Sequence, residues 1–179
     1  MELKKKSMLE LQRPSIEEYK QQPKMPLLLI LDNLRSALNV GAAFRTADAF
    51  GIEGIYLTGI SAQPPQREIM KSALGADRAV DWQYFEENKA AIAAAKAKGY
   101  KVYAVEQTFG SHSLEQFVWA AQEGIALIFG NEVKGVDAEL LPLVDGAIEI
   151  PQFGSKHSLN VSVSMGVLLW EMRRQYFGR

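Results

Sequence analysis

Residues 27–51, LLLILDNLRSALNVGAAFRTADAFG, contain the pattern that decides the fold. Leu27–Leu31 has the length of a strand, and its unbroken apolar character is typical of a strand that is buried on both faces. A polar segment follows. Asn39–Phe50 then has a helical pattern that Gly51 closes, where a left-handed cap is favourable. The stretch therefore predicts a strand, a loop and a helix in immediate succession.

The same alternation continues along the chain. Further apolar runs of strand length are Ile55–Thr58, Lys101–Val105, Ile125–Phe129 and Ala147–Ile150. Further helical patterns are Glu86–Lys98, closed by Gly99, and Ser158–Phe177, closed by Gly178. Strands and helices in alternation predict an α/β domain, with a mostly parallel sheet and helices on both of its faces.

Composition limits the size and class of the protein. The 179 residues are enough for about one domain. The chain has 20 Lys and Arg and 21 Asp and Glu, so its net charge is close to zero. Many nucleic-acid-binding domains are instead strongly basic. The chain has no cysteine, which excludes disulfides, thiolate metal sites and cysteine nucleophiles, and we expect no bound metal.

The N-terminal segment differs in character from the rest. We expect residues 1–24 to form a polar, basic extension and residues 25–179 to form a single domain. The Lys4–Lys6 run is either a solvated end or an arm that contacts phosphates. No apolar run approaches the ~18 residues that span a bilayer, and the N-terminus lacks the apolar stretch of a signal peptide. We therefore expect a cytoplasmic protein that does not enter a membrane.

Ligands of such sheets bind beyond the carboxyl ends of the strands. Three polar, glycine-containing loops follow predicted strands, at residues 32–41, 130–135 and 151–160. No Gly-x-Gly-x-x-Gly follows the first strand, and no P-loop motif is present, so dinucleotide-binding and P-loop functions lose their main support. A flavodoxin-like nucleotide-binding domain stays open as an alternative.

Each loop has a functional and a purely structural interpretation. Asn39 is either a helix N-cap or a site residue, and Gly41 lets a ligand or another backbone approach. Arg45 is either an ordinary surface residue or one whose planar, forked guanidinium group binds a phosphate. Glu132 is either a turn carboxylate or one that accepts from helix N-terminal amides or orients an arginine.

The loop before the closing helix carries the most unusual polar residues. We expect Ser158 to cap that helix. Asn160 would then lie inside the helix, where an asparagine is unfavourable without a partner for its amide, and this misfit suggests a function. His157 is interpreted as a loop residue, because no second metal ligand or nucleophile lies near it in sequence.

Together the loops resemble the SpoU (TrmH-type) RNA 2'-O-methyltransferases of the SPOUT superfamily. The first motif is Asn39-x-Gly41-x-x-x-Arg45-Thr46-Ala47, the second is Phe129-Gly130-Asn131-Glu132-x-x-Gly135, and the third runs from Ile150-Pro151 to Ser158-Leu159-Asn160. The chain departs from the usual motifs at Asn131, Val133, Gln152 and His157.

The resemblance implies a C-terminal trefoil knot, S-adenosylmethionine as donor, a homodimer, and methyl transfer to a ribose 2'-hydroxyl of RNA, with tRNA favoured as the substrate over rRNA. The tRNA preference is expected because the chain has no room for the separate RNA-binding domain of many rRNA enzymes. The implied catalytic residues are Arg45, supported by Asn39, Glu132, Ser158 and Asn160. The implied donor contacts are Val105, Gly130, Ile150, Ser158 and Leu159. A non-catalytic RNA-binding relative is the other alternative.

Overall fold

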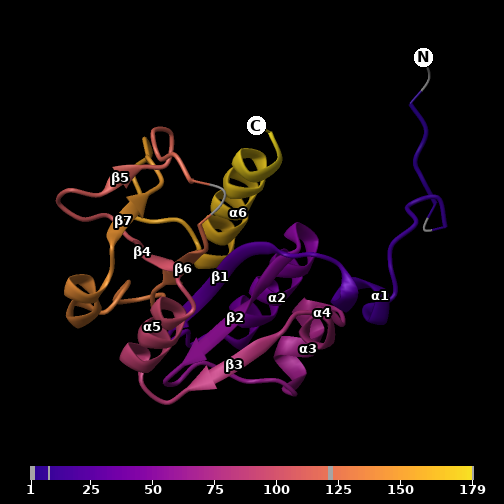
Figure 1. The fold of residues 1–179 in the computed structure, drawn as a ribbon, viewed down its shortest axis with the longest axis horizontal. Helices are drawn as coiled ribbons and strands as arrows, with labels where there is room; N and C mark the ends of the chain where they lie inside the picture. Colours follow the sequence, from indigo (N-terminus) through magenta and orange to yellow (C-terminus); the bar gives the residue numbers. More distant parts are fainter. Residues whose placement is uncertain (1–2, 8, 121–122, 179) are drawn as a thin grey trace.

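The computed structural model describes residues 3–7, 9–120 and 123–178, which form one seven-stranded sheet. Its strands are β1 (Met25–Asp32), β2 (Ile52–Thr58), β3 (Trp82–Phe85), β4 (Lys101–Val105), β5 (His112–Ser113), β6 (Ile125–Phe129) and β7 (Gly146–Glu149). They are ordered β3-β2-β1-β6-β4-β7-β5, and neighbouring strands pair in parallel throughout (Figure 1). The predicted parallel sheet is confirmed.

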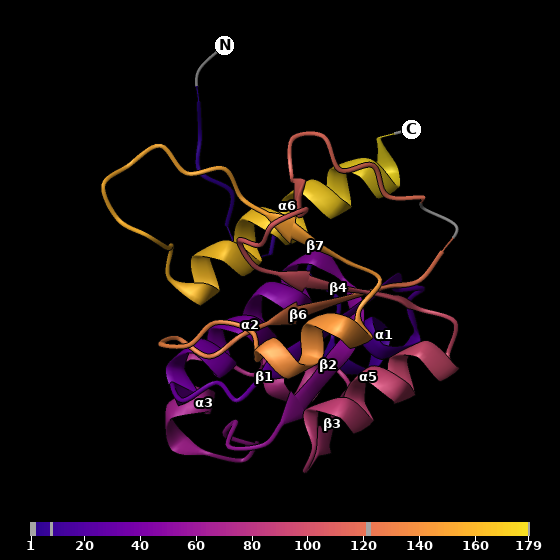
Figure 2. The same ribbon diagram turned by 90° about the vertical axis from the view of Figure 1, so that its left-hand side faces the viewer.

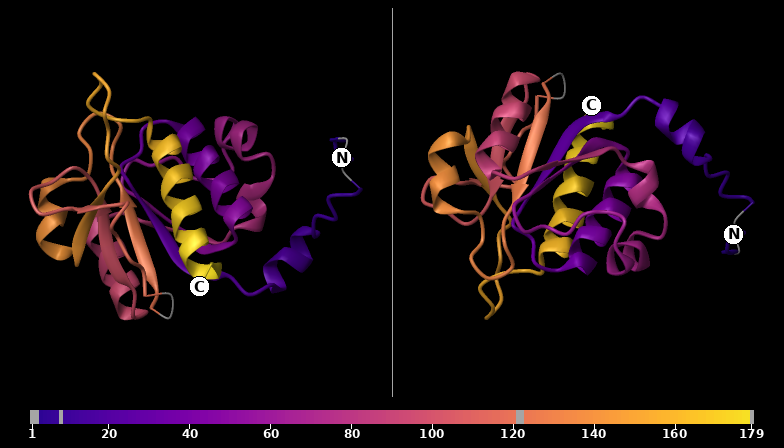
Figure 3. Two further views of the ribbon diagram at one scale, coloured as in Figure 1. Left: turned by 90° about the horizontal axis from the view of Figure 1, so that it is seen from above. Right: turned by 90° about the horizontal axis from the view of Figure 1, so that it is seen from below.

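Helices cover both faces of this sheet. They are α1 (Ile16–Gln21), α2 (Ala37–Phe50), α3 (Arg67–Ala73), α4 (Ala76–Ala79), α5 (Asn88–Ala97) and α6 (Val161–Phe177), with a short 3₁₀ helix η1 (Ala138–Leu143). On one face α6, α2 and α3 lie side by side, and Figure 3 shows α2 between the other two. The other face is covered by α5 and η1, on the side of the strands opposite α6 (Figure 2).

The central strand β1 shows why its sequence has no polar interruption. Leu27, Leu29 and Leu31 are buried in the core beneath α2 and α6, whereas Leu28 and Ile30 are buried in the core beneath α5. Successive side chains of a strand point to opposite faces, so a strand covered on both sides needs apolar residues at every position.

Two of the three predicted glycine caps have the expected conformation. Gly51 and Gly99 have φ angles of 63° and 85°, in the left-handed region that favours glycine. The prediction was wrong for Gly178, whose φ is −92°. There the last turn closes without a left-handed residue, because the Gly178 amide donates to the carbonyl of Arg174.

Several short elements were not predicted from the sequence. Strand β3 is half exposed and lacks a continuous apolar run, and β5 has only two residues, so neither carries the pattern of a buried strand. Helices α1, α3 and α4 have seven residues or fewer, too short for a helical period to stand out.

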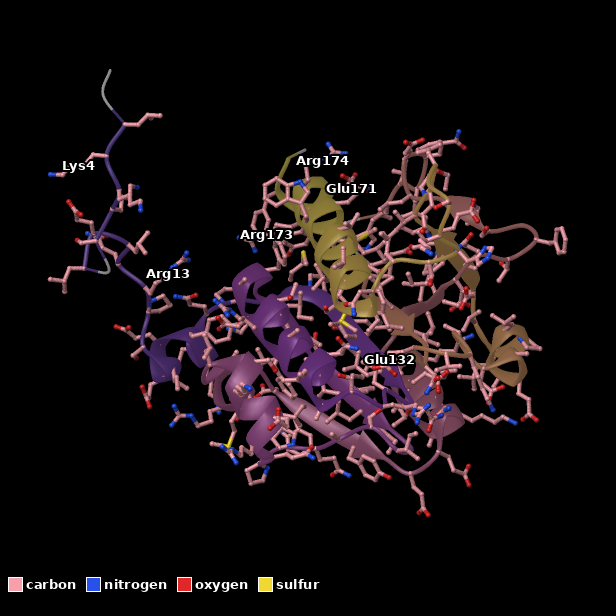
Figure 4. All side chains as sticks on the ribbon, turned by 180° about the vertical axis from the view of Figure 1, so that it is seen from behind. Lys4, Arg13, Glu132, Glu171, Arg173 and Arg174 are labelled. Carbon is pink, nitrogen blue, oxygen red and sulfur yellow. The ribbon has the colours of Figure 1, made fainter. Side chains whose placement is uncertain are left out.

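The N-terminal segment reaches the core at one point. Tyr19 of α1 is buried, and the Lys24 ammonium lies 3.1 Å from the centre of its ring. Lys4–Lys6 are exposed, in a stretch that extends away from the body of the molecule (Figure 4). The division at residue 24 stays a proposal, and residues 1, 2 and 8 of the extension lie outside the described residues. The trefoil knot also stays a prediction.

Among the described residues, no helix combines the length and the apolar character that crossing a membrane requires.

Candidate active site

A cavity of about 650 Å³ lies beyond the carboxyl ends of β4, β6 and β7. Its walls come from the loops that follow these strands and from the first turn of α6, and its volume is in the range of small-molecule sites. All five residues implied as donor contacts line it: Val105, Gly130, Ile150, Ser158 and Leu159. The structure thus brings together residues that are up to 54 positions apart in the sequence.

The loop after β6 folds tightly back on itself. The Gly135 amide donates to the Asn131 carbonyl at 2.8 Å, and the Asn131 side-chain oxygen accepts from the Val133 amide at 2.9 Å. A Cβ atom on Gly130 would collide with the backbone of Gly135 and Val136. Gly130 is therefore needed for the loop to close, whatever the loop binds.

Asn131 also joins this loop to the one after β1. Its side-chain amide donates to the carbonyl of Asn33 at 2.8 Å. One asparagine thus shapes its own turn and anchors that turn to a neighbouring strand end. This gives the departure from the usual second motif a structural role.

Glu132 makes the second link between the same two loops. Its carboxylate accepts from the backbone amides of Arg35 and Ser36 at 2.9 and 3.0 Å, and from the Asn39 side chain at 2.9 Å. The sequence left several roles open for Glu132. The structure favours a carboxylate that accepts hydrogen bonds from amides at the N-terminus of a helix. Figure 4 shows Glu132 near the N-terminal end of α6.

The hydrogen bonds also determine the charge state of Glu132. Partial burial raises the pKa of this carboxyl group, but the bonds donated by Asn39, Arg35 and Ser36 stabilise the ionised form more strongly. The pKa of Glu132 is consequently lower than its ordinary value of 4.5.

The structure decides between the alternatives for Asn39 and Gly41 of the first motif. Ser36 caps α2, since its hydroxyl accepts from the Asn39 amide at 3.3 Å, so Asn39 is not the N-cap. A Cβ atom on Gly41 would collide with the Ile69 carbonyl and the Ser72 hydroxyl of α3. Gly41 therefore admits another backbone, and not a ligand.

Arg45 lies apart from the cavity. It is exposed on α2. It lies seven positions after Leu38 and four before Ala49, and both of these residues are exposed as well. Residues at these spacings share one side of a helix, so Arg45 points outward from the body. It lines no part of the cavity and makes no hydrogen bond or ion pair with any residue that the structure describes.

The third motif requires a correction. Helix α6 begins at Val161, and Asn160 is its N-cap, with its side-chain oxygen accepting from the Ser162 amide at 2.9 Å. The prediction that Ser158 caps this helix was wrong, and Asn160 does not lie inside it. Both residues line the cavity, and the Ser158 hydroxyl makes no hydrogen bond with a described residue, which leaves it free for a ligand.

Glu106 and Gln107 line the cavity but were missed in the sequence. The Glu106 carboxylate accepts from the Val136 and Gln107 amides at 3.0 and 2.9 Å, and the Gln107 side chain donates to the His157 carbonyl at 2.8 Å. They fix the loops after β6 and β7 against the end of β4. The signal was present, because both residues directly follow a strand-length apolar run.

Within the described ranges, no group of three or more His, Asp or Glu side chains is placed to hold a metal ion.

Comparison with known proteins identifies the fold and motifs together. Residues 26–170 match the SpoU rRNA methylase family. The chain belongs to that family. It is 31% identical over 166 residues to a tRNA (guanosine(18)-2'-O)-methyltransferase of Thermus thermophilus, covering 93% of this chain and 84% of that protein. The family predicted from the three motifs is confirmed, which removes the flavodoxin-like alternative.

Two further relatives are longer than this chain. An uncharacterised tRNA/rRNA methyltransferase of Synechocystis is 31% identical over 155 residues, which are 86% of this chain and 55% of that protein. The solved structure of an AdoMet-bound rRNA methyltransferase from Sinorhizobium meliloti has a TM-score of 0.77 and 30% identity, and the match covers 91% of this chain and 61% of that one. The chain thus spans little more than half the length of these relatives.

Replacing Glu132 by Gln should lower the free energy of unfolding by about 1 kcal/mol at neutral pH, a small value because the residue is exposed and solvent screens its charge. Since the folded-state pKa is below 4.5, this contribution is present above about pH 4.5 and is lost as the pH falls through the folded-state pKa. Denaturant unfolding of both proteins across this pH range checks the prediction.

Glu115→Gln is the control, because that exposed carboxylate has no hydrogen bond to a described residue. A difference between wild type and Glu132→Gln that stays constant down to pH 3 would contradict the role assigned to the ionised group.

Asn160→Ala should lower the free energy of unfolding by about 1 kcal/mol, the usual cost of losing an N-cap. Asn160→Asp should retain most of the stability, because a carboxylate oxygen also accepts from the Ser162 amide. Ser158→Ala should leave stability unchanged. Thermal or denaturant unfolding of the three variants measures these effects, and a larger loss in Ser158→Ala than in Asn160→Ala would reverse the assignment of the cap.

Proposed function

We propose that this chain transfers a methyl group from S-adenosylmethionine to the ribose 2'-hydroxyl of a tRNA nucleotide, in the cytoplasm. Family membership carries the general activity, methylation of RNA. The observation that carries the specific reaction is the cavity of about 650 Å³, which gathers residues of the second and third motifs at one edge of the sheet. The Thermus relative, named for 2'-O-methylation of tRNA, favours tRNA as the substrate. The S. meliloti relative makes rRNA the second choice.

The lining of the cavity fits the proposed donor. Val105, Ile150 and Leu159 give apolar surface for an adenine ring, and Ser158 has a free hydroxyl. Glu106 and Glu132 are among the residues that line the same space, and their negative charges suit a cationic ligand. When bound, S-adenosylmethionine supplies an electrophilic methyl group on a positively charged sulfur.

The acceptor is the harder part of the reaction. A ribose 2'-hydroxyl is a poor nucleophile at neutral pH, so it must be held in line with the methyl group and lose its proton as it attacks. An arginine stays protonated in proteins and is therefore poorly suited to take that proton. We propose that Arg45 binds a substrate phosphate and stabilises the developing alkoxide charge as a fixed cation.

The position of Arg45 has a consequence for assembly. Val163, Val167 and Trp170 form an apolar stripe along α6 and are 50%, 39% and 63% exposed. This stripe lies beside α2, since Trp170 packs edge-on against Phe50 (Figure 3). We propose that two copies pair across this face and that pairing brings an Arg45 to each cavity.

The function is tested by mapping 2'-O-methylated nucleotides in total RNA from cells with and without the gene. We expect one or more tRNA positions to lose the modification. Loss confined to rRNA would overturn the choice of tRNA, and no loss of methylation in any RNA would favour the non-catalytic relative.

Arg45→Ala should leave the affinity for S-adenosylmethionine nearly unchanged and slow methyl transfer by about 10² or more, the scale of losing one preorganised electrostatic group. Arg45→Lys keeps the cation but loses the planar fork, so it should retain part of the rate with little change in pH dependence. Single-turnover transfer measured against pH, together with calorimetry of donor binding, separates these effects. A rate limb that moves to lower pH in Arg45→Lys would instead identify a base.

Trp170→Glu should convert the proposed dimer to a monomer, because it places a charge in the centre of an apolar contact. Sedimentation at low micromolar concentration measures this, and methyl transfer should be lost in parallel. A wild-type protein that sediments as a fully active monomer would contradict the proposed assembly.

A further inference from the structure

Helix α3 presents an exposed stripe that the proposed cavity and dimer face do not use. Arg67 and Lys71 are four residues apart, as are Met70 and Leu74, and Arg67 and Met70 are three apart. These spacings place all four residues on one side of the helix and its C-cap residue. Met70 and Leu74 are 52% and 68% exposed, whereas Ile69 and Ala73, on the other side, are buried. We call these four residues the α3 stripe.

The cations of the α3 stripe have no ion-pair partner among the residues that the structure describes. Neither Arg67 nor Lys71 forms a hydrogen bond or ion pair through its side chain with any residue in the described ranges. Glu68 of α3 and Asp77 of the neighbouring helix α4 also form no hydrogen bond or ion pair through their side chains with a described residue. The two cations are thus available to an external anion.

The opposite face of the sheet shows a contrasting arrangement. On and next to α5, Lys89, Lys96 and Lys98 form ion pairs with Glu139, Asp145 and Glu53, at distances of 2.9, 3.3 and 3.4 Å. Cations on that face have carboxylate partners of their own chain. The cations without a partner on α3 are therefore a local feature of that helix. They do not result from a general excess of lysine and arginine, since the whole chain has a net charge of −1.

Helix α3, which carries this stripe, is also held firmly against α2, the helix that carries Arg45. Gly41 lets the Ile69 carbonyl approach α2 closely, and the Ser72 hydroxyl donates to the Leu38 carbonyl at 3.0 Å. Figure 3 shows α3 on the side of α2 that faces away from α6. A ligand strand bound at Arg45 would meet the α3 stripe next, outside the apolar stripe of α6.

We propose that the α3 stripe is an RNA contact surface, in which Arg67 and Lys71 bind two backbone phosphates on one side of the modified nucleotide. This inference rests on the proposed function, because it takes RNA as the partner. Guanidinium and ammonium groups are the usual ligands of nucleic-acid phosphates, and Met70 and Leu74 supply apolar surface for the sugars between them. The stripe thus alternates between cations and apolar side chains, which matches the alternation of phosphates and sugars along an RNA backbone.

The test is a double variant, Arg67→Gln with Lys71→Gln, measured against unfractionated tRNA and total rRNA at several salt concentrations. Two lost phosphate contacts should weaken binding about tenfold at low salt and reduce the slope of log affinity against log salt by about 1.4 to 1.8. Lys89→Gln with Lys96→Gln removes the same charge from the opposite face and should change neither quantity.

Two further measurements keep the proposal falsifiable. Donor affinity by calorimetry and the sedimentation coefficient should be unchanged in the double variant, because the α3 stripe lies outside the cavity and the α6 face. Met70→Gln with Leu74→Gln should also remain dimeric. Unchanged RNA binding and salt slope in the charge variant would overturn the proposal, and so would dissociation of either variant into monomers, which would assign the stripe to a second copy.

These results are separable from a failure of the proposed function. Wild-type protein that binds RNA but transfers no methyl group would refute the proposed reaction and leave the comparison of RNA affinities valid. Wild-type protein that methylates normally, with a double variant that binds RNA equally well, would refute the role of the α3 stripe alone.

Discussion

The carboxylate of Glu132 is the contact on which the candidate site depends. It accepts three hydrogen bonds from residues 35–39, nearly one hundred positions earlier in the chain, and Asn131 beside it adds a fourth bond to the loop after β1. The start of α2 and the wall of the cavity therefore share one anchor. Loss of the negative charge would loosen both together, because ionised acceptors form stronger hydrogen bonds than neutral ones.

A second carboxylate fixes the same sheet edge toward the other face. Asp32, at the end of β1, is buried and accepts from the Asn33 and Asn88 side chains at 2.8 and 2.6 Å and from the Asp137 amide at 2.9 Å. Burial raises the pKa of Asp32, while the bonds from the Asp137 amide and the Asn33 side chain act against that change. Carboxylates at the end of β1 and three residues beyond the end of β6 thus hold loops from both faces together, which makes this edge a rigid support for a site.

The sequence predicted what depends on local pattern and missed what depends on tertiary contact. The apolar run of β1 and the helix of α2 follow from periodicity, and the motif residues of the cavity followed from resemblance. The N-cap of α6 was misassigned because Ser158 and Asn160 are both favourable caps, and only the folded loop decides between them. The separation of Arg45 from the cavity was likewise invisible, because a motif states which residues are present but not which surface each faces.

Charged residues are unevenly distributed over this molecule, although its net charge is only −1. Three glutamates, Glu106, Glu132 and Glu149, are among the residues that line the cavity, against the single lysine Lys134 among the lining residues described. On α2 and α3, Arg45, Arg67 and Lys71 are exposed and form no ion pair with a described residue, and the acidic residues of these two helices are Asp48 and Glu68. An acidic cavity suits a cationic donor and a basic flank suits a polyanion, so net charge alone was a poor argument against an RNA partner. Two ligands of opposite charge can then bind to neighbouring surfaces without competing for the same groups.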